Sequence, residues 1–255
     1  LFTRLILFNN LLKEIDGLEK IKESYLPFVT LGLIADVMPV IKTNRILISI
    51  GLSYIRDKKN YNLTKLFEKA NIDISLCSGK DVAWSICPAL NASGRIGCAD
   101  VTVDFLTAKK EVEKKITAML SNNEERKKKG EEAFNIFIED LQNNKESYDN
   151  RLTFFYSEKI ARGITGITAT KIANMVNCPV IVAAKEGEYY TGSMRGKSNI
   201  HLVDFLNNAK DILEEFGGHK EAAGFRFHEN NLSLFKNFLK EKSSLIDNVE
   251  PKEEE

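Results

Sequence analysis

The sequence has no net charge and few of the cysteine and histidine residues that form zinc sites or disulfide frameworks. Its 36 Lys and Arg residues are balanced by 36 Asp and Glu residues, so any surface that attracts nucleic acid must be a local basic patch. The four cysteines form no C-x-x-C pair and have no histidine at zinc-finger spacing. We therefore expect free thiols in a reducing cytoplasm.

Long apolar runs are also missing. No stretch approaches the roughly 18 residues that a membrane span requires, and nothing resembles a cleavable signal, so we expect a cytoplasmic protein with no membrane partner. The 255 residues are enough for two domains with buried cores. The chain starts at Leu1 and not at methionine, which fits a processed, cloned or truncated segment better than an intact gene product.

The first part of the chain shows apolar residues at helical spacing, separated by turn signals such as Asp16-Gly17. Periodicity does not assign the apolar run 28–35, which Pro27 opens and Asp36 ends. A loop is expected at 91–95, with 82–86 leading into it. The predicted helices cover residues 1–12, 45–55 and 63–70.

Residues 101–141 are dominated by Lys, Glu, Asn and Arg, with apolar side chains recurring at helical spacing. This pattern predicts a long, largely exposed helix that connects two domains. The segment 122–129 could be a nucleic-acid patch, but its charges alternate in sign near its start, which favours a solvated helix face. The apolar positions are Val112, Ile116, Leu120, Phe134, Phe137 and Leu141.

After Arg151, strands and helices alternate, which predicts a compact α/β domain. An Asn-Cys-Pro turn leads into a buried strand whose hairpin partner follows it. The acidic residues 247–255 are expected to be disordered. The predicted strands are 152–156, 180–184, 189–194 and 225–228, and the predicted helices are 165–176, 201–215 and 232–242.

The most informative segment is Gly217-Gly218-His219-Lys220-Glu221-Ala222-Ala223-Gly224-Phe225. Paired glycines permit positive φ and a close approach of the backbone to a ligand, and they place His219 at a fixed point. The segment also has a purely local interpretation. In that interpretation Gly217 ends a helix that finishes at 214–216, and residues 222–225 begin a buried strand.

This segment resembles the Gly-Gly-His-x-x-Ala-Ala-Gly signature of the DHH-associated domain, found in RecJ exonucleases and related phosphoesterases. Four further stretches resemble RecJ motifs in the right order. Five ordered matches over most of the chain are hard to obtain by chance, so the chain is identified as a RecJ-like member of the DHH phosphoesterase family. The four stretches are Leu31 to Val40 (the fourth motif), Pro88 to Gly97 (the Asn-Ala-x-Gly-Arg motif), Gly163 to Ala169, and Gly192 to Arg195.

The resemblance implies an α/β protein of two domains joined by a long helix, and it implies a helix over 28–35. It assigns residues 1–106 to the C-terminal part of a DHH phosphoesterase domain and residues 107–148 to the connector helix. Residues 149–246 would form the DHH-associated, substrate-binding domain, followed by the acidic tail 247–255.

Asp36, Arg95 and His219 are expected to act in catalysis. An aspartate that ends an apolar element is commonly a cap or a solvated residue, but its match to the fourth motif implies that Asp36 binds Mn²⁺ or Mg²⁺. The ion would generate hydroxide and neutralise the scissile phosphate. Arg95 alone would be an exposed charge or part of an ion pair. The resemblance implies that its planar fork, with Asn91 and Ser93, faces the DNA backbone.

In the second domain the resemblance implies a surface that holds phosphates without reading the base sequence. His219 would complete it by donating a hydrogen bond to a phosphate oxygen. Ser198 belongs either to this surface or to a polar hairpin exit, and His201 and His228, which match no motif, are expected in surface or structural roles. The residues assigned to substrate binding here are Ser193, Arg195, Gly217, Gly218 and His219.

Two departures from the family affect the expected activity. Many RecJ-like proteins have a histidine just before the Gly-x-x-Gly-Ile stretch, where this chain has Ile160-Ala161-Arg162. The family's Asp-x-Asp motif, a further aspartate and the Asp-His-His triplet lie before the fourth motif, and no Asp-His-His occurs in this chain. One carboxylate binds manganese weakly, so this polypeptide alone should not hold two metal ions.

The leading hypothesis is a single-strand-specific 5′ to 3′ DNA exonuclease of repair and recombination, which hydrolyses the terminal phosphodiester with two metal ions. This chain would be a truncated piece of it, with single-stranded DNA, a helicase and a single-strand binding protein as candidate partners. One alternative is a DHH-family phosphodiesterase acting on short oligoribonucleotides or cyclic dinucleotides. Another is a catalytically silent module that binds nucleic acid or a protein.

Overall fold

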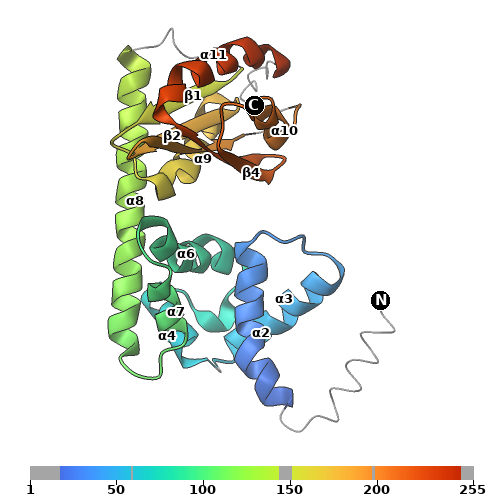
Figure 1. Ribbon diagram of the computed structural model, residues 1–255. Coiled ribbons are helices and arrows are strands. Elements are labelled where there is room, and N and C mark those ends of the chain that lie inside the picture. Colours follow the sequence, from blue (N-terminus) through green and yellow to red (C-terminus); the bar gives the residue numbers. More distant parts are fainter. Residues whose placement is uncertain (1–17, 59, 144–150, 197–198, 248–255) are drawn as a thin grey trace. The chain divides into compact units, whose positions relative to one another are not determined.

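The computed structural model describes residues 18–58, 60–143, 151–196 and 199–247. The chain divides into two compact units, Leu1–Asn123 and Glu124–Glu255 (Figure 1). The expected helix over 1–12, Ser198 and the acidic residues 248–255 lie outside the described residues. None of the described helices is long and apolar enough to cross a membrane.

Helices joined by turns and short irregular segments make up the described residues of the first unit. The run 28–35 is helical, as the resemblance implied, but its helix already includes the residues from Leu18 onward, so that Pro27 lies inside it. Proline fits best in the first turn of a helix because it has no N–H to donate, which is why the sequence suggests a later start. The elements are α2 (Leu18–Ala35), α3 (Lys42–Arg56), α4 (Tyr61–Lys69), η1 (Ile74–Leu76), α5 (Gly79–Asp81), η2 (Val82–Ile86), α6 (Cys87–Ile96) and α7 (Asp100–Leu106).

Helices α2 and α3 approach closely because a glycine faces a threonine. Thr30 is fully buried, and its Oγ1 donates to the carbonyl oxygen of Leu47 at 3.2 Å. A Cβ built on Gly51 would overlap the Thr30 hydroxyl. A side chain at position 51 would therefore push the two helices apart and open the core that Leu31 and Leu52 form beside this contact.

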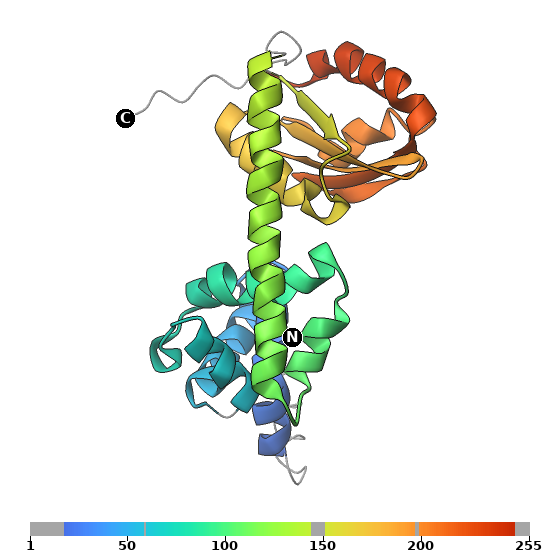
Figure 2. The same cartoon turned by 90° about the vertical axis from the view of Figure 1, so that its left-hand side faces the viewer.

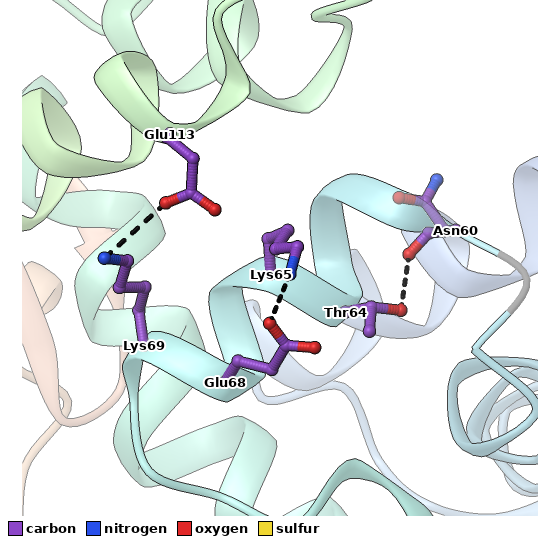
Figure 3. Close-up of polar contacts among 6 residues, drawn as sticks. All are labelled: Asn60, Thr64, Lys65, Glu68, Lys69 and Glu113. Atoms are coloured by element: carbon purple, nitrogen blue, oxygen red, sulfur yellow. Dashed lines mark hydrogen bonds and ion pairs between the residues drawn. The ribbon is translucent and has the colours of Figure 1, made fainter.

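Polar side chains cap α4 and join it to α8 (Val112–Asn143) (Figure 3). The Asn60 side chain accepts a hydrogen bond from a backbone N–H of the first turn, and the backbone carbonyl oxygen of Asn60 accepts one from Thr64 Oγ1 at 2.9 Å. Lys69 Nζ lies 3.5 Å from a carboxylate oxygen of Glu113 in α8, and both side chains are exposed. Such a pair contributes at most about 1 kcal/mol, so the cap does more than the ion pair to fix where α4 begins.

The segment 91–95 is helical, and the prediction of a loop there is wrong. Helix α6 follows the π turn η2 directly and has Pro88 in its first turn, where a missing N–H breaks no helical hydrogen bond. Gly94 lies inside the helix, which continues to Ile96. A glycine in a helix costs only about 1 kcal/mol relative to alanine, and packing outweighs this cost.

The second unit is built on a sheet that is covered by helices (Figures 1 and 2). The sheet has five strands, in the order β1-β2-β3-β5-β4. Strands β1 and β2 are parallel, and the other neighbours are antiparallel. Helix α9 packs on β2 and β3, while α10 and α11 cover the aromatic core on the other face. The predicted α/β class is confirmed, as are the helices 165–176 and 232–242. The elements are β1 (Thr153–Ser157), η4 (Arg162–Ile164), α9 (Thr165–Val176), β2 (Val180–Glu186), β3 (Tyr189–Arg195), α10 (Leu202–Asn207), β4 (Glu215–His219), β5 (Ala222–His228), η5 (Glu229–Asn231), α11 (Leu232–Lys242) and η6 (Ser243–Leu245).

The predicted long helix is found as α8, which crosses the boundary between the two units; the residues before it form the separate α7. In the second unit, the ring of Phe137 packs edge-on against Phe155 of β1, with 5.3 Å between centroids. Lys171 of α9 forms an ion pair with Glu131 at 2.7 Å and lies 4.1 Å from the centroid of the Phe134 ring. These contacts hold the second half of α8 beside α9.

The predicted helix over 201–215 is wrong in its second half. Helix α10 ends at Asn207, and β4 follows as an edge strand paired with β5. Gly217 therefore ends no helix and lies within a hairpin. In the strand, Phe216 joins the aromatic core opposite Phe225, and this tertiary gain overrides the local helical spacing.

The four cysteines are free thiols in this fold. Cys98 is exposed, and Cys77, Cys87 and Cys178 are buried. Burial raises the pKa of the Cys87 thiol to about 11, so this thiol stays protonated at neutral pH. The three buried cysteines act as small apolar residues of the two cores.

Asn62 closes the end of α7. Its buried Nδ2 donates to the carbonyl oxygens of Phe105, Leu106 and Ala108 at 2.9, 3.2 and 3.0 Å. We expect Asn62→Leu to lower the free energy of unfolding by about 2 kcal/mol, because buried carbonyls lose their donor. Asn208→Ala is the control, since this exposed amide also bonds carbonyls at a helix end, and it should cost less than about 0.5 kcal/mol. Urea unfolding measures both values, and equal losses would contradict the role of burial at Asn62.

Candidate functional site

Pairing across three strands places Arg195 and His219 in one row of the second unit's sheet. Arg195 ends β3 and lies opposite Ala222 of β5, which in turn lies opposite His219 of β4. Residues directly opposite each other in antiparallel strands project to the same face. The sheet therefore presents a guanidinium and an exposed imidazole on one face, with only a methyl group between them.

The next row along this face carries almost no side chains. Ser193 pairs with Gly224 of β5, which pairs with Gly217 of β4. A Cβ built on Gly217 would meet no atom within 4 Å, and one on Gly224 would meet only the Gly192 carbonyl oxygen at 3.8 Å. We call the surface of Gly217, Ala222 and Gly224 the glycine platform. Its backbone is open to close approach by a ligand.

Gly218 has a different structural role from Gly217. Its φ is 141°, and a Cβ there would overlap the Ala222 carbonyl oxygen and lie 2.7 Å from the Ala223 Cα. The hairpin that follows is tied down by the N–H of Leu202, which donates to the Lys220 carbonyl oxygen at 2.9 Å. Gly218 therefore shapes the hairpin, whereas its neighbour leaves the platform uncovered.

The side chains of Ser193 and Arg195 lie against the first turn of α9. Ser193 Oγ is 3.1 Å from Thr165 Oγ1. Arg195 Nη1 donates to the carbonyl oxygens of Met194 and Ala223 at 2.8 and 3.1 Å. These bonds fix a hydroxyl and a cation at the border of the glycine platform.

Sequence reasoning missed Thr165 and Gly166 as parts of this site. The segment 163–169 resembles a family motif, but the sequence alone assigns no role to its residues. In the structure Thr165 contacts Ser193, and Gly166 lies against Arg195. Only the packing of α9 on β3 reveals this, because the two segments are far apart in the sequence.

The remaining histidines of the second unit have surface and structural positions. Nδ1 of His228 accepts a hydrogen bond from the N–H of Asn230 at 3.2 Å, and its ring packs edge-on against Tyr189 at 5.3 Å. His201 is exposed and precedes the first residue of α10. These are the surface and structural positions expected for the two residues.

In the first unit, Asp36 directly follows α2 and is exposed. Its N–H donates to the Gly32 carbonyl oxygen at 3.0 Å, so Asp36 continues the helical turn. Spacing of three or four residues along a helix places Ile21, Tyr25 and Val29, all exposed, on the same side. The carboxylate therefore stands at the end of an exposed apolar stripe.

The described residues do not form a metal centre around Asp36. No group of three or more His, Cys, Asp or Glu side chains that could hold a metal ion occurs among them. Ions such as Mg²⁺ and Mn²⁺ prefer several oxygen ligands. The donors present in this part of the chain therefore do not fit a two-metal site by themselves.

The residues of α6 that were predicted to face the DNA backbone lie on different sides of the helix. Asn91 and Arg95 are four residues apart and both exposed, so they share one side of the helix. Ser93 is fully buried, and its Oγ accepts a hydrogen bond from Asn122 Nδ2 of α8 at 3.0 Å. The prediction that Ser93 faces a phosphate is therefore wrong. Residues two apart on a helix point to opposite sides, and this hydroxyl holds α6 against α8.

The adjacent glycines of the hairpin allow a matched comparison. Gly218→Ala should lower the free energy of unfolding by about 2 kcal/mol, because it strains the backbone and collides with the Ala222 carbonyl. Gly217→Ala meets no atom and should cost less than about 1 kcal/mol. Guanidinium unfolding of the two variants measures the difference. Similar losses in both would refute the separate roles of the two glycines.

Comparison with known proteins supports the resemblance. Residues 149–244 match the DHHA1 domain. The chain is 31% identical over 221 residues to the single-stranded-DNA-specific exonuclease RecJ of Escherichia coli (strain K12), and 30% identical over the same length to that of Salmonella typhimurium. Each match covers 82% of this chain and 38% of the relative, so the chain spans well under half the length of these proteins.

The fold also matches a solved relative. A crystal structure of RecJ from Thermus thermophilus in complex with Mg²⁺ matches 89% of this chain and 35% of its own, with a TM-score of 0.78 at 26% identity. The Mn²⁺ complex of RecJ from the same organism also gives a TM-score of 0.78. Sequence, domain and fold agree, and the chain is a RecJ-like protein of the DHH phosphoesterase family that contains a DHHA1 domain.

Proposed function

We propose that the complete protein is a single-strand-specific DNA exonuclease and that this chain holds the sugar-phosphate backbone of its substrate. The observation that carries the proposal is the row of Arg195, Ala222 and His219 beside the glycine platform. A cation and an imidazole there flank a backbone that carries no bulky side chain. The relatives named as RecJ suggest the substrate class.

The chemistry of this surface suits phosphates better than bases. The Arg195 guanidinium is planar and always charged, and it matches the oxygens of a phosphate. The exposed ring of His219 adds an N–H donor. Because the chain has no net charge, these local groups must supply the attraction. Contacts of this kind position a strand without reading its sequence.

We infer that Mn²⁺ or Mg²⁺ assists hydrolysis in the complete protein and that Asp36 is one ligand. A carboxylate is the hard oxygen donor that both ions prefer, and such an ion supplies hydroxide and neutralises phosphate charge. The described residues lack a group large enough for this centre. The other ligands must therefore come from outside these residues.

The remaining assignments belong to the same proposal. Asn91 and Arg95, exposed on one side of α6, are further candidates for phosphate contact, with Arg95 the stronger because it is charged. Residues 1–106 would belong to the DHH domain and residues 107–148 to a connector. The DHHA1 match supports a substrate-binding domain over 149–246. The 5′ to 3′ polarity, cytoplasmic action and cooperation with a helicase or a single-strand binding protein complete the proposal.

A catalytically silent module is the second candidate for this chain on its own. The lack of a metal-holding group among the described residues favours it. Calorimetric titration with Mn²⁺ decides, because tight binding of two ions would contradict a silent module. A phosphodiesterase of short oligonucleotides would be separated from an exonuclease by its preference for dinucleotides over long single-stranded DNA.

In the complete protein, Asp36→Ala should reduce manganese-dependent release of mononucleotides from 5′-phosphorylated single-stranded DNA by about 100-fold, because the metal loses a ligand. Asp104→Ala removes another exposed carboxylate, in α7, and should leave the rate unchanged. Release is measured at saturating Mn²⁺. A rate that survives Asp36→Ala would show that the metal assignment is wrong.

For this chain itself, Arg195→Ala should weaken binding of single-stranded oligonucleotides about tenfold, because one charge-assisted phosphate contact is lost. The loss should be similar for all sequences, and the dependence of log K on log salt should fall by about one unit. Fluorescence anisotropy with several oligonucleotides at several salt concentrations measures both. A loss confined to one sequence would indicate base contact instead.

A further inference from the structure

Gly166 is the second residue of α9, and its backbone does not explain why it is a glycine. It is not among the residues with positive φ, unlike Gly187, Gly196 and Gly218. Alanine is about 1 kcal/mol more favourable than glycine inside a helix. The helix alone would therefore favour a side chain at this position.

Neighbouring side chains account for the glycine. A Cβ built on Gly166 would lie 3.0 Å from Arg195 Nη2 and 3.4 Å from Ser193 Oγ. The first distance is shorter than an ordinary van der Waals contact, so the guanidinium would have to move. A Cβ on Gly130 in α8, by contrast, would meet no atom within 4 Å.

A shift of the Arg195 guanidinium would disturb its other contacts. Its Nη1 donates to the carbonyl oxygens of Met194 and Ala223 at 2.8 and 3.1 Å, while Nη2 lies beside Gly166. Because the guanidinium is planar and rigid, a shift of Nη2 also shifts Nη1 away from those carbonyls. The two carbonyls and the bare Cα of Gly166 together restrict the position of the cation.

The same turn of α9 orients Ser193. Thr165 Oγ1 donates its only proton to the Arg162 carbonyl oxygen at 2.9 Å. In the 3.1 Å contact between the two hydroxyls, Ser193 Oγ is therefore the donor. The Ser193 proton is engaged in this bond, and Arg195 is the charged member of this pair.

We propose that Gly166 is a positioning residue, which keeps Arg195 directed at a substrate phosphate at the border of the glycine platform. The proposal rests on the proposed function for the identity of the ligand. The contact between positions 166 and 195 does not depend on it.

The binding test is a double-variant comparison on this chain with a 5′-phosphorylated single-stranded oligonucleotide. Gly166→Ala should weaken binding measurably, but by no more than the roughly tenfold loss expected for Arg195→Ala. The double variant should bind no more weakly than Arg195→Ala alone, because both changes remove the same contact. Gly130→Ala is the matched control and should bind like the parent chain. Unchanged binding by Gly166→Ala, or multiplied losses in the double variant, would overturn the proposal.

Thermal unfolding of the same variants tests the contact without a ligand. In the parent background, Gly166→Ala should leave the melting temperature unchanged or lower it. In the Arg195→Ala background it should raise the melting temperature, as is also expected for Gly130→Ala, because the collision is gone and the helix propensity remains. Equal shifts in the two backgrounds would overturn the proposal. If the parent chain binds no oligonucleotide, the proposed function fails, and this melting comparison alone decides the role of Gly166.

Discussion

The pairing of β5 between β3 and β4 is the constraint on which the candidate site depends. Phe225 of β5 lies against Gly192 of β3, where a Cβ would overlap its ring, so a glycine on β3 permits this register. Phe225 also stacks with Phe227 in the aromatic core on that face. A slip of one residue would turn every side chain of β5 to the opposite face. The core on one face thus fixes the row of Arg195 and His219 on the other.

The two units differ in how completely they bury apolar side chains. Of the sixteen large hydrophobic side chains exposed among the described residues, thirteen belong to the first unit. Four of them follow Asp36 within five residues, and the most exposed are Val37 at 86% and Ile41 at 61%; the other two are Met38 and Val40. Exposed apolar patches commonly mark interaction surfaces. The surroundings of Asp36 therefore have the character of an interface, which agrees with a chain that spans 38% of its relatives' length.

The sequence predicts an element well where its local pattern and its tertiary role agree. Helices α9 and α11 have apolar residues at helical spacing and pack those residues on the sheet, and their bounds are predicted correctly. The stretch that becomes β4 looks helical by spacing, but Phe216 gains more by joining the aromatic core as part of a strand. Ser93 is misjudged for a related reason. Its motif suggests phosphate contact, while its place in α6 turns it toward Asn122.

Three glycines show why the site itself is only partly predictable. Gly218 is required by its backbone conformation, Gly217 leaves open space, and Gly166 makes room for a guanidinium from another element. The sequence shows glycine in each case, and no local sequence pattern distinguishes the three structural roles. A motif therefore indicates where the backbone must carry no side chain. The contacts among α9, β3, β5 and β4 determine which group occupies the space that the glycine leaves. For Arg195 the consequence is a restricted position, because the bare Cα of Gly166 and the two carbonyls all lie against the guanidinium.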